Sequence, residues 1–126
     1  AMLDKTVIGR GTKFDNQVHI AHNVRVGKNC IILAGTAVGG SVVIGDGTVI
    51  SGGCVIKDNI TLGERVNVVG HSAVSDDVKS GETVWGLPAM SFSRAKRVYL
   101  RLKQLPELVK RVRDLEKKMD ELKKGA

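Results

Sequence analysis

The stretch VVIGDGTVISGGCVIKDNITLG, residues 42–63, decides the fold because its large apolar residues recur at every sixth position. Ile44, Ile50, Ile56 and Leu62 carry the pattern here, and it continues without a break in both directions. A period of six residues over this many repeats predicts a solenoid of stacked coils. The complete series is Ile8, Phe14, Ile20, Val26, Ile32, Val38, Ile44, Ile50, Ile56, Leu62, Val68 and Val74.

A longer period of 18 residues overlies the hexads. Gly9, Gly27, Gly45 and Gly63 lie 18 residues apart, and each follows a large apolar residue. Three hexads per coil predict a parallel β-helix with three flat faces, in which the large residue of each hexad points inward. We expect these glycines to permit backbone shapes that other residues resist. A second series, mostly small or β-branched, should fill a slot near each corner: Thr12, Val18, Val24, Cys30, Thr36, Val42, Thr48, Cys54, Ile60, Val66, Ser72 and Val78.

These patterns divide the chain into three parts. Residues 1–79 should form the β-helix of about four coils, and SGETVWGLPAM begins a capping loop over residues 80–92. Residues 93–126 should form two helices separated at Pro106, which breaks the first helix and suits the first turn of the second. Ala1 and Met2 resemble an expression remnant, and no capping sequence precedes the first hexad, so we expect a fragment of a longer protein.

The second helix and the short β-helix both indicate a homotrimer. Four coils have two open ends and a thin core, so neighbouring subunits should supply the missing burial. The helix carries apolar residues at alternating spacings of four and three, which is the a/d seam of about two heptads. The seam residues are Leu108, Val112, Leu115, Met119 and Leu122.

The charge lies almost entirely in the tail. Residues 1–92 carry eight basic and eight acidic side chains, whereas residues 93–126 carry twelve and five, out of a net charge of +7. A basic tail indicates an acidic partner. With few aromatic residues and no Gly-rich phosphate loop, we expect no nucleic-acid binding. The lack of a signal peptide and of a long apolar run predicts no membrane span and a cytoplasmic location.

Superimposing the hexads places the three histidines of the chain. His19 precedes inward Ile20 and should point outward from a flat face, whereas His22 should lie at a corner, beside Gly40 and Asp58 of the next two coils. His71 falls at a different corner, so a zinc site of converging histidines is not expected. From spacing alone, His22 is either a solvated corner residue or a catalytic group held by rigid coils.

The two cysteines and the corner column next to His22 complete the set of candidate residues. Cys30 and Cys54 fall in the interior slot and belong to different columns of the 18-residue repeat, so we expect buried free thiols rather than a disulfide. The corner column next to His22 contains Asn23, Ser41, Asn59 and Asp77.

The segment FDNQVHIAHNVRVG, residues 14–27, resembles the signature IDNQ-x-x-IAHNV-x-IG of bacterial UDP-3-O-(3-hydroxyacyl)glucosamine N-acyltransferases. TVIG at residues 6–9, GLPA at residues 86–89 and the basic tail are similar to the carboxy-terminal part of the same family. The resemblance implies a left-handed coil and a homotrimer with active sites between subunits. It also implies that a 3-hydroxyacyl chain passes from acyl carrier protein to the 2-amino group of a UDP-3-O-acylglucosamine in lipid A biosynthesis, without a cofactor or a metal.

The resemblance also assigns roles to residues. His22 would be the general base, Gly40 would supply the N–H for the oxyanion, and Asp15 is a candidate to orient the imidazole. A second histidine of the family falls at Asn59, and we expect Asn23 and Asn59 to bind substrate. From the tail we expect the carrier protein to dock on three basic residues: Arg94, Arg97 and Arg101.

Two other interpretations remain open at this point. The chain fits another hexapeptide-repeat transferase that uses acetyl-CoA or forms an O-acyl product. It also fits a trimeric scaffold without activity, because the family's uridine-binding amino-terminal domain has no counterpart in this sequence.

Overall fold

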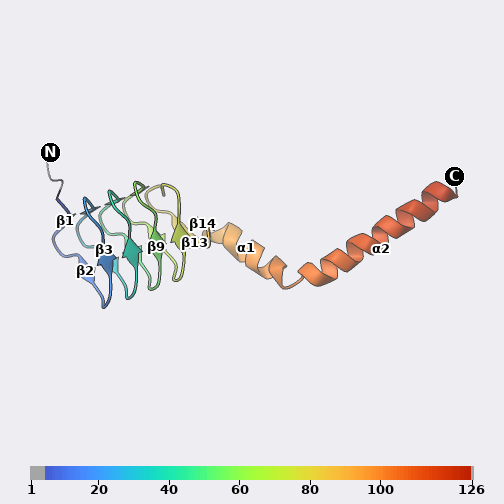
Figure 1. Cartoon of the computed structure of the whole chain (residues 1–126), viewed down its shortest axis with the longest axis horizontal. Coiled ribbons are helices and arrows are strands. Elements are labelled where there is room, and N and C mark those ends of the chain that lie inside the picture. The colour runs from blue at the N-terminus through green and yellow to red at the C-terminus, as the bar shows by residue number, and fades with distance from the viewer. Residues whose placement is uncertain (1–4, 126) are drawn as a thin grey trace. The chain divides into compact units, whose positions relative to one another are not determined.

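The computed structural model describes residues 5–125, so residues 1–4 of the predicted β-helix and residue 126 of the predicted tail lie outside it. The chain divides after Ala95 into two compact units. The first unit is a parallel β-helix (Figure 1). Its coils are built from two-residue strands: Val7–Ile8 (β1), Lys13–Phe14 (β2), His19–Ile20 (β3), Arg25–Val26 (β4), Ile31–Ile32 (β5), Ala37–Val38 (β6), Val43–Ile44 (β7), Val49–Ile50 (β8), Val55–Ile56 (β9), Thr61–Leu62 (β10), Asn67–Val68 (β11) and Ala73–Val74 (β12).

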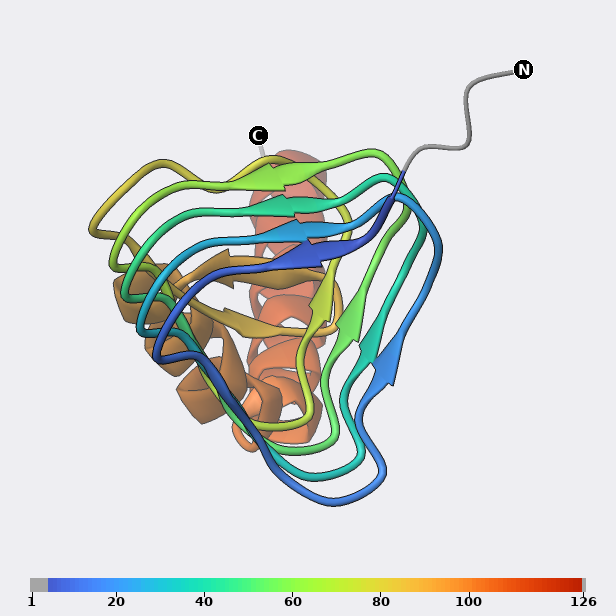
Figure 2. The ribbon, with the colours of Figure 1, turned by 90° about the vertical axis from the view of Figure 1, so that its left-hand side faces the viewer.

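Each strand pairs with the strand three positions further along the chain, which gives three parallel sheets around one core. Viewed along the axis, the coils form a triangle (Figure 2). The sheets are β1-β4-β7-β10, β2-β5-β8-β11 and β3-β6-β9-β12. The register steps by 18 residues, as Val26 pairs with Ile44 and Ile44 with Leu62. The predicted superperiod is therefore confirmed.

The inward series forms the core as predicted. Ile32, Ile44, Ile50 and Leu62 are each 0–1% exposed. Only the first coil departs from the pattern, since Ile8 is 46% and Phe14 is 38% exposed, because no described residue stacks on that side.

Hydroxyl groups in the corner slot link successive coils. The Thr48 hydroxyl donates to the Gly63 carbonyl at 2.9 Å and accepts the Val66 N–H at 3.2 Å. Thr36 makes the equivalent bonds to Ser51 and Cys54. A buried hydroxyl is tolerated only when it is hydrogen-bonded, and here every coil offers the same pair of backbone groups.

The glycines at 18-residue spacing serve a purpose different from the one that the sequence suggested. We expected unusual backbone shapes, but none of these four glycines has a positive φ. Instead, a Cβ added to Gly45 would lie 2.5 Å from the Gly63 carbonyl carbon and 2.6 Å from the Glu64 nitrogen. Successive coils approach too closely there for any side chain. The left-handed positions are the second residues of the corner turns: Gly11, Gln17, Asn23, Asn29, Gly35, Ser41, Gly47, Gly53, Asn59, Arg65, His71 and Gly81.

Residues 80–92 are not a simple loop, which corrects the predicted boundary. Thr83–Gly86 (β13) pairs with β11 and extends the parallel sheet, and Ala89–Ser91 (β14) returns antiparallel to it. The hairpin forms because Val84 continues the inward column and is buried beneath Val68 of the coil below. The Trp85 and Phe92 rings pack 5.7 Å apart and close this end of the β-helix.

The tail contains two helices, as predicted. Phe92–Leu102 (α1) begins one residue earlier than expected, and the Ser91 hydroxyl accepts the Arg94 N–H at 3.4 Å. Leu105–Lys124 (α2) has Pro106 in its first turn and no buried residue. Within residues 5–125, neither helix has the length and apolar character needed to cross a lipid bilayer.

Candidate functional site

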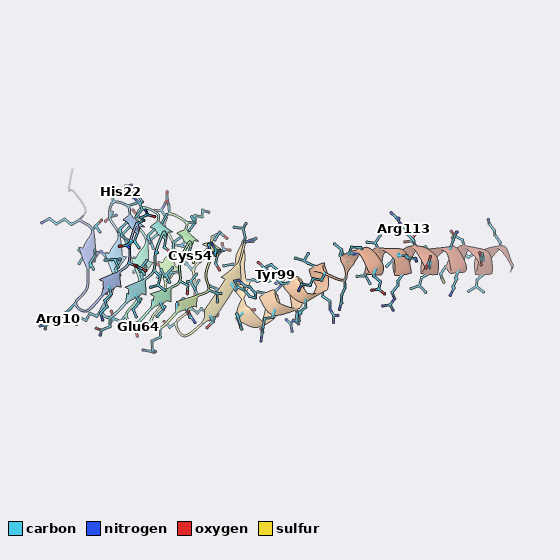
Figure 3. All side chains as sticks on the ribbon, turned by 90° about the horizontal axis from the view of Figure 1, so that it is seen from below. Arg10, His22, Cys54, Glu64, Tyr99 and Arg113 are labelled. Carbon is cyan, nitrogen blue, oxygen red and sulfur yellow. The ribbon has the colours of Figure 1, made fainter. Side chains whose placement is uncertain are left out.

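His22 lies on the turn between β3 and β4, at one edge of the β-helix (Figure 3). We call this edge the His22 corner, formed by residues 21–24, 39–42, 57–60 and 75–78. His22 is exposed, and Gly40 of the next coil is buried beneath its ring. A Cβ added to Gly40 would lie 2.8 Å from His22 Nε2 and 2.9 Å from Cε1. The missing side chain of Gly40 is therefore what allows the imidazole to rest on the backbone of the next coil.

A groove runs past His22 along the outer face of the β3-β6-β9-β12 sheet. Its walls come from three successive coils. They include His19, which points outward from the flat face as the superimposed hexads predicted. The lining residues are His19, Ala21, His22, Ala37, Val38, Gly39, Gly40, Val55, Ile56, Lys57 and Asp58.

The Gly40 N–H is not free, which differs from the arrangement that the resemblance implied. It donates to Asp58 Oδ1 at 3.1 Å. The same oxygen lies where a Cβ of Gly39 would stand. The Gly39–Gly40 pair is thus held between the imidazole of the preceding coil and the carboxylate of the following coil. The sequence placed Asp58 in this column but could not predict which backbone group its carboxylate would accept.

The Asp58 interaction has a copy elsewhere in the fold. At another corner, Asp46 Oδ1 accepts the Lys28 N–H at 2.8 Å and covers Gly27 in the same way. An aspartate 18 residues after a backbone N–H is therefore a general way for this fold to satisfy a corner N–H. Of the two aspartates, Asp58 lines the His22 groove and Asp46 does not.

The structure does not bring Asp15 to His22 within one chain. Asp15 Oδ1 accepts the N–H of Asn16, at the end of β2, and no hydrogen bond joins Asp15 to His22 within residues 5–125. An orienting role for Asp15 in the single chain is therefore not supported. The reason is geometric, because seven residues carry the chain past one corner and along a whole face.

Asn23 and Asn59 lie in the left-handed column of the His22 corner. Asn23 Nδ2 donates to the Ser41 hydroxyl at 3.1 Å. Asn59 is exposed, and its backbone N–H donates to the Gly40 carbonyl at 3.0 Å. The two side chains are separated by the coil that carries Ser41. Their assignment to substrate remains a prediction.

The other histidine and the cysteines lie outside the groove. The His71 ring covers Gly53 at a different corner, as the spacing predicted. Cys30 and Cys54 are buried free thiols, also as predicted. Burial raises the pKa of the Cys54 thiol, although hydrogen bonds around the sulfur partly oppose the rise. Such a thiol remains protonated and unreactive near neutral pH.

In the tail, two of the three candidate docking residues share a groove. Arg97 and Arg101 line it together with apolar side chains from α1 and α2. Arg101 also donates to Gln104 Oε1 at 2.9 Å, across the break between the helices. Arg94 is exposed in the first turn of α1. The apolar lining consists of Val98, Leu102, Leu105 and Leu108.

Comparisons with known proteins agree with this fold. Residues 5–40 match the bacterial transferase hexapeptide (six repeats) family. Among solved structures, LpxA from Acinetobacter baumannii superimposes with a TM-score of 0.67 at 29% identity, over 68% of this chain and 33% of that one. A serine acetyltransferase in complex with CoA gives 0.66 at 26% identity, over 68% and 38%. These neighbours establish the fold as a left-handed parallel β-helix.

Sequence relatives are closer still. UDP-3-O-acylglucosamine N-acyltransferase from Nitratidesulfovibrio vulgaris is 54% identical over 99% of this chain and 36% of its own length. The Caulobacter vibrioides protein of the same name is 66% identical over 71% of this chain and 26% of its own. The chain therefore spans about a third of the length of the curated relatives that it matches.

Proposed function

The chain matches the UDP-3-O-acylglucosamine N-acyltransferases over nearly its whole length, and we propose that it carries the acyl-transfer centre of such an enzyme. The donor is a 3-hydroxyacyl chain held as a thioester on acyl carrier protein. The acceptor is the 2-amino group of a UDP-3-O-acylglucosamine, in lipid A biosynthesis. The observation that carries the proposal is the imidazole of His22 resting on Gly40, beside an open groove.

The chemistry follows from this pair. The acceptor nitrogen attacks the thioester carbonyl, so an N–C bond forms and the C–S bond breaks. His22 Nε2 takes the proton that the nitrogen loses and returns it to the departing sulfur, which leaves as a thiol. An imidazole suits this role because its pKa lies near neutral pH. The charge that develops on the carbonyl oxygen requires an N–H donor, and the Gly40 N–H lies next to the imidazole.

The apolar seam of α2 supports assembly as a homotrimer. Leu108, Val112, Leu115, Met119 and Leu122 are 46, 45, 59, 55 and 71% exposed in the single chain. An isolated helix of this length is only marginally stable in water, and burying the seam between copies would remove that exposure. In the proposed trimer the His22 groove lies between subunits.

The tail groove supports docking of the carrier protein. Arg97 and Arg101 flank an apolar floor, which suits an acidic protein that also presents apolar side chains. Changing both to Glu should weaken carrier binding at least tenfold, and added salt should weaken binding of the unmodified protein. Arg113, which does not line this groove, gives the matched control as Arg113→Glu. Carrier binding that does not depend on salt would contradict this docking surface.

The experiment that tests the proposed function compares donors. The full-length protein is incubated with UDP-3-O-acylglucosamine and either 3-hydroxyacyl carrier protein or acetyl-CoA, and the products are identified by mass spectrometry. We expect an N-acylated product from the carrier thioester alone. Transfer from acetyl-CoA alone would instead identify another hexapeptide-repeat transferase, and no transfer from either donor would favour a scaffold.

A further inference from the structure

Asp58 is the one acidic side chain among the groove-lining residues, and it is only half used by the fold. Its Oδ1 accepts the Gly40 N–H, whereas within the described residues Oδ2 has no hydrogen bond and no cation pairs with the carboxylate. Asp58 is also exposed. The carboxylate therefore offers a free oxygen and an uncompensated charge beside His22.

The position of Asp58 conflicts with the chemistry as long as its charge stays uncompensated. The Gly40 N–H carries a single hydrogen, and a carboxylate accepts it more strongly than the neutral carbonyl of a thioester does. An oxyanion formed beside this carboxylate would also be repelled by its charge. The transfer step therefore requires that Asp58 be neutralised or drawn away from Gly40.

The acyl acceptor supplies a suitable cation. Amino groups with a pKa of about 7.7–8.0, such as the α-amino group, are largely protonated at neutral pH, so a primary amine of this kind arrives mostly as an ammonium. An ammonium forms short, charge-assisted hydrogen bonds with a carboxylate. Gly40 contacts both Asp58 and His22, so a nitrogen bound to Asp58 lies within one residue of the imidazole.

We propose that Asp58 is the docking point for the primary ammonium of the acyl acceptor, and that this pairing loosens its hold on the Gly40 N–H. The inference rests on the proposed function. It makes Asp58 a specificity-determining residue for amine acceptors, since a hydroxyl or an amide brings no positive charge to the carboxylate.

Asp46 provides the control, because it makes the same backbone hydrogen bond outside the groove. Asp58→Ala and Asp46→Ala should lower the melting temperature by similar amounts. In the full-length protein, Asp58→Ala should raise KM for the amine acceptor by about tenfold or more, as loss of a charge-assisted hydrogen bond does. KM for the thioester donor should stay the same or fall. Asp46→Ala should leave both KM values within twofold of the unmodified protein.

Two kinetic results would overturn the inference. An acceptor KM within twofold of normal in Asp58→Ala would remove the docking role, and an equal rise in Asp46→Ala would reduce the effect to structure. Asp58→Asn refines the comparison, because its amide oxygen can still accept the Gly40 N–H but cannot pair with a cation. It should share the acceptor defect.

A second measurement keeps the inference separate from the proposed function. In the ¹⁵N-labelled full-length protein, the Gly40 amide resonance should shift on addition of glucosamine but not of N-acetylglucosamine. The Lys28 amide, bonded to Asp46, should not respond to either sugar. A Gly40 amide that does not respond to glucosamine refutes the docking role even in an active enzyme. A specific response in a protein that transfers no acyl group refutes only the proposed function.

Discussion

Replacing Gly40 with Ala should separate catalysis from stability. The new methyl group would lie 2.8 Å from His22 Nε2 and 2.9 Å from Cε1, closer than carbon and nitrogen atoms pack. The Gly40 φ lies outside the left-handed region, so Ala fits its backbone. The side chain in the way belongs to an exposed residue and can rotate to another staggered rotamer. We therefore expect a stability loss below about 1 kcal/mol, which is in the range of ordinary surface changes.

The catalytic cost should be much larger. The methyl group removes the imidazole from the place beside the Gly40 N–H, which amounts to losing the general base. Such a loss typically lowers the rate by about 10²–10⁴-fold. The assay is acyl transfer by the full-length protein, together with melting followed by circular dichroism.

The neighbouring glycine gives the contrasting variant. A Cβ on Gly39 would meet backbone atoms, 2.7 Å from the Asp58 nitrogen and 2.9 Å from the Ile56 oxygen. Backbone cannot rotate away, so Gly39→Ala should cost about 1–3 kcal/mol of overpacking, with a fall in Tm of about 4–8 °C per kcal/mol. Gly70→Ala, whose nearest contact is 3.5 Å, should change neither property. Near-normal turnover in Gly40→Ala, or melting as low as that of Gly39→Ala, would refute this reasoning.

Three further predictions concern the fold and its assembly. Thr48→Val should destabilise the protein by about 1–3 kcal/mol, because a buried carbonyl and N–H lose their partner, whereas exposed Thr61→Val should change stability by less than about 0.5 kcal/mol in thermal melts. Because the folded state raises the Cys54 pKa above 9.0, the thiol's contribution to stability is complete below that pH and is lost as pH rises beyond it. Unfolding at pH 8 and pH 10 should show a larger loss in the unmodified protein than in Cys54→Val, and equal losses would contradict the burial argument. Leu115→Asp should shift the sedimentation mass from trimer to monomer by placing carboxylates in the seam, and an intact trimer would exclude the seam as the interface.

The coils and the core were predictable because they depend on one-dimensional spacing. A side chain that recurs every sixth residue returns to the same face in every coil, so Ile44, Ile50 and Leu62 could be assigned to the interior from the sequence. The corner position of His22 and its contact with Gly40 followed from the same superposition.

Features that depend on distances between coils were not predictable. The need for glycine at Gly45 comes from close stacking, which no local propensity encodes. Likewise, the bond between Asp58 and the Gly40 N–H depends on a side-chain rotamer at an exposed corner. The β13–β14 hairpin was missed because Gly86 and Pro88 resemble loop residues, although Val84 continues the inward column.

The central claim is that His22 is the base of an acyl-transfer site. The most direct measurement compares His22→Ala with His19→Ala in the full-length protein, since both histidines line the same groove and only His22 rests on Gly40. We predict that His22→Ala loses about 10²–10⁴-fold in transfer from 3-hydroxyacyl carrier protein to UDP-3-O-acylglucosamine, while its oligomeric state and melting temperature stay unchanged. His19→Ala should remain within severalfold of the unmodified enzyme. Equal losses in the two variants, or near-normal turnover in His22→Ala, would contradict the claim.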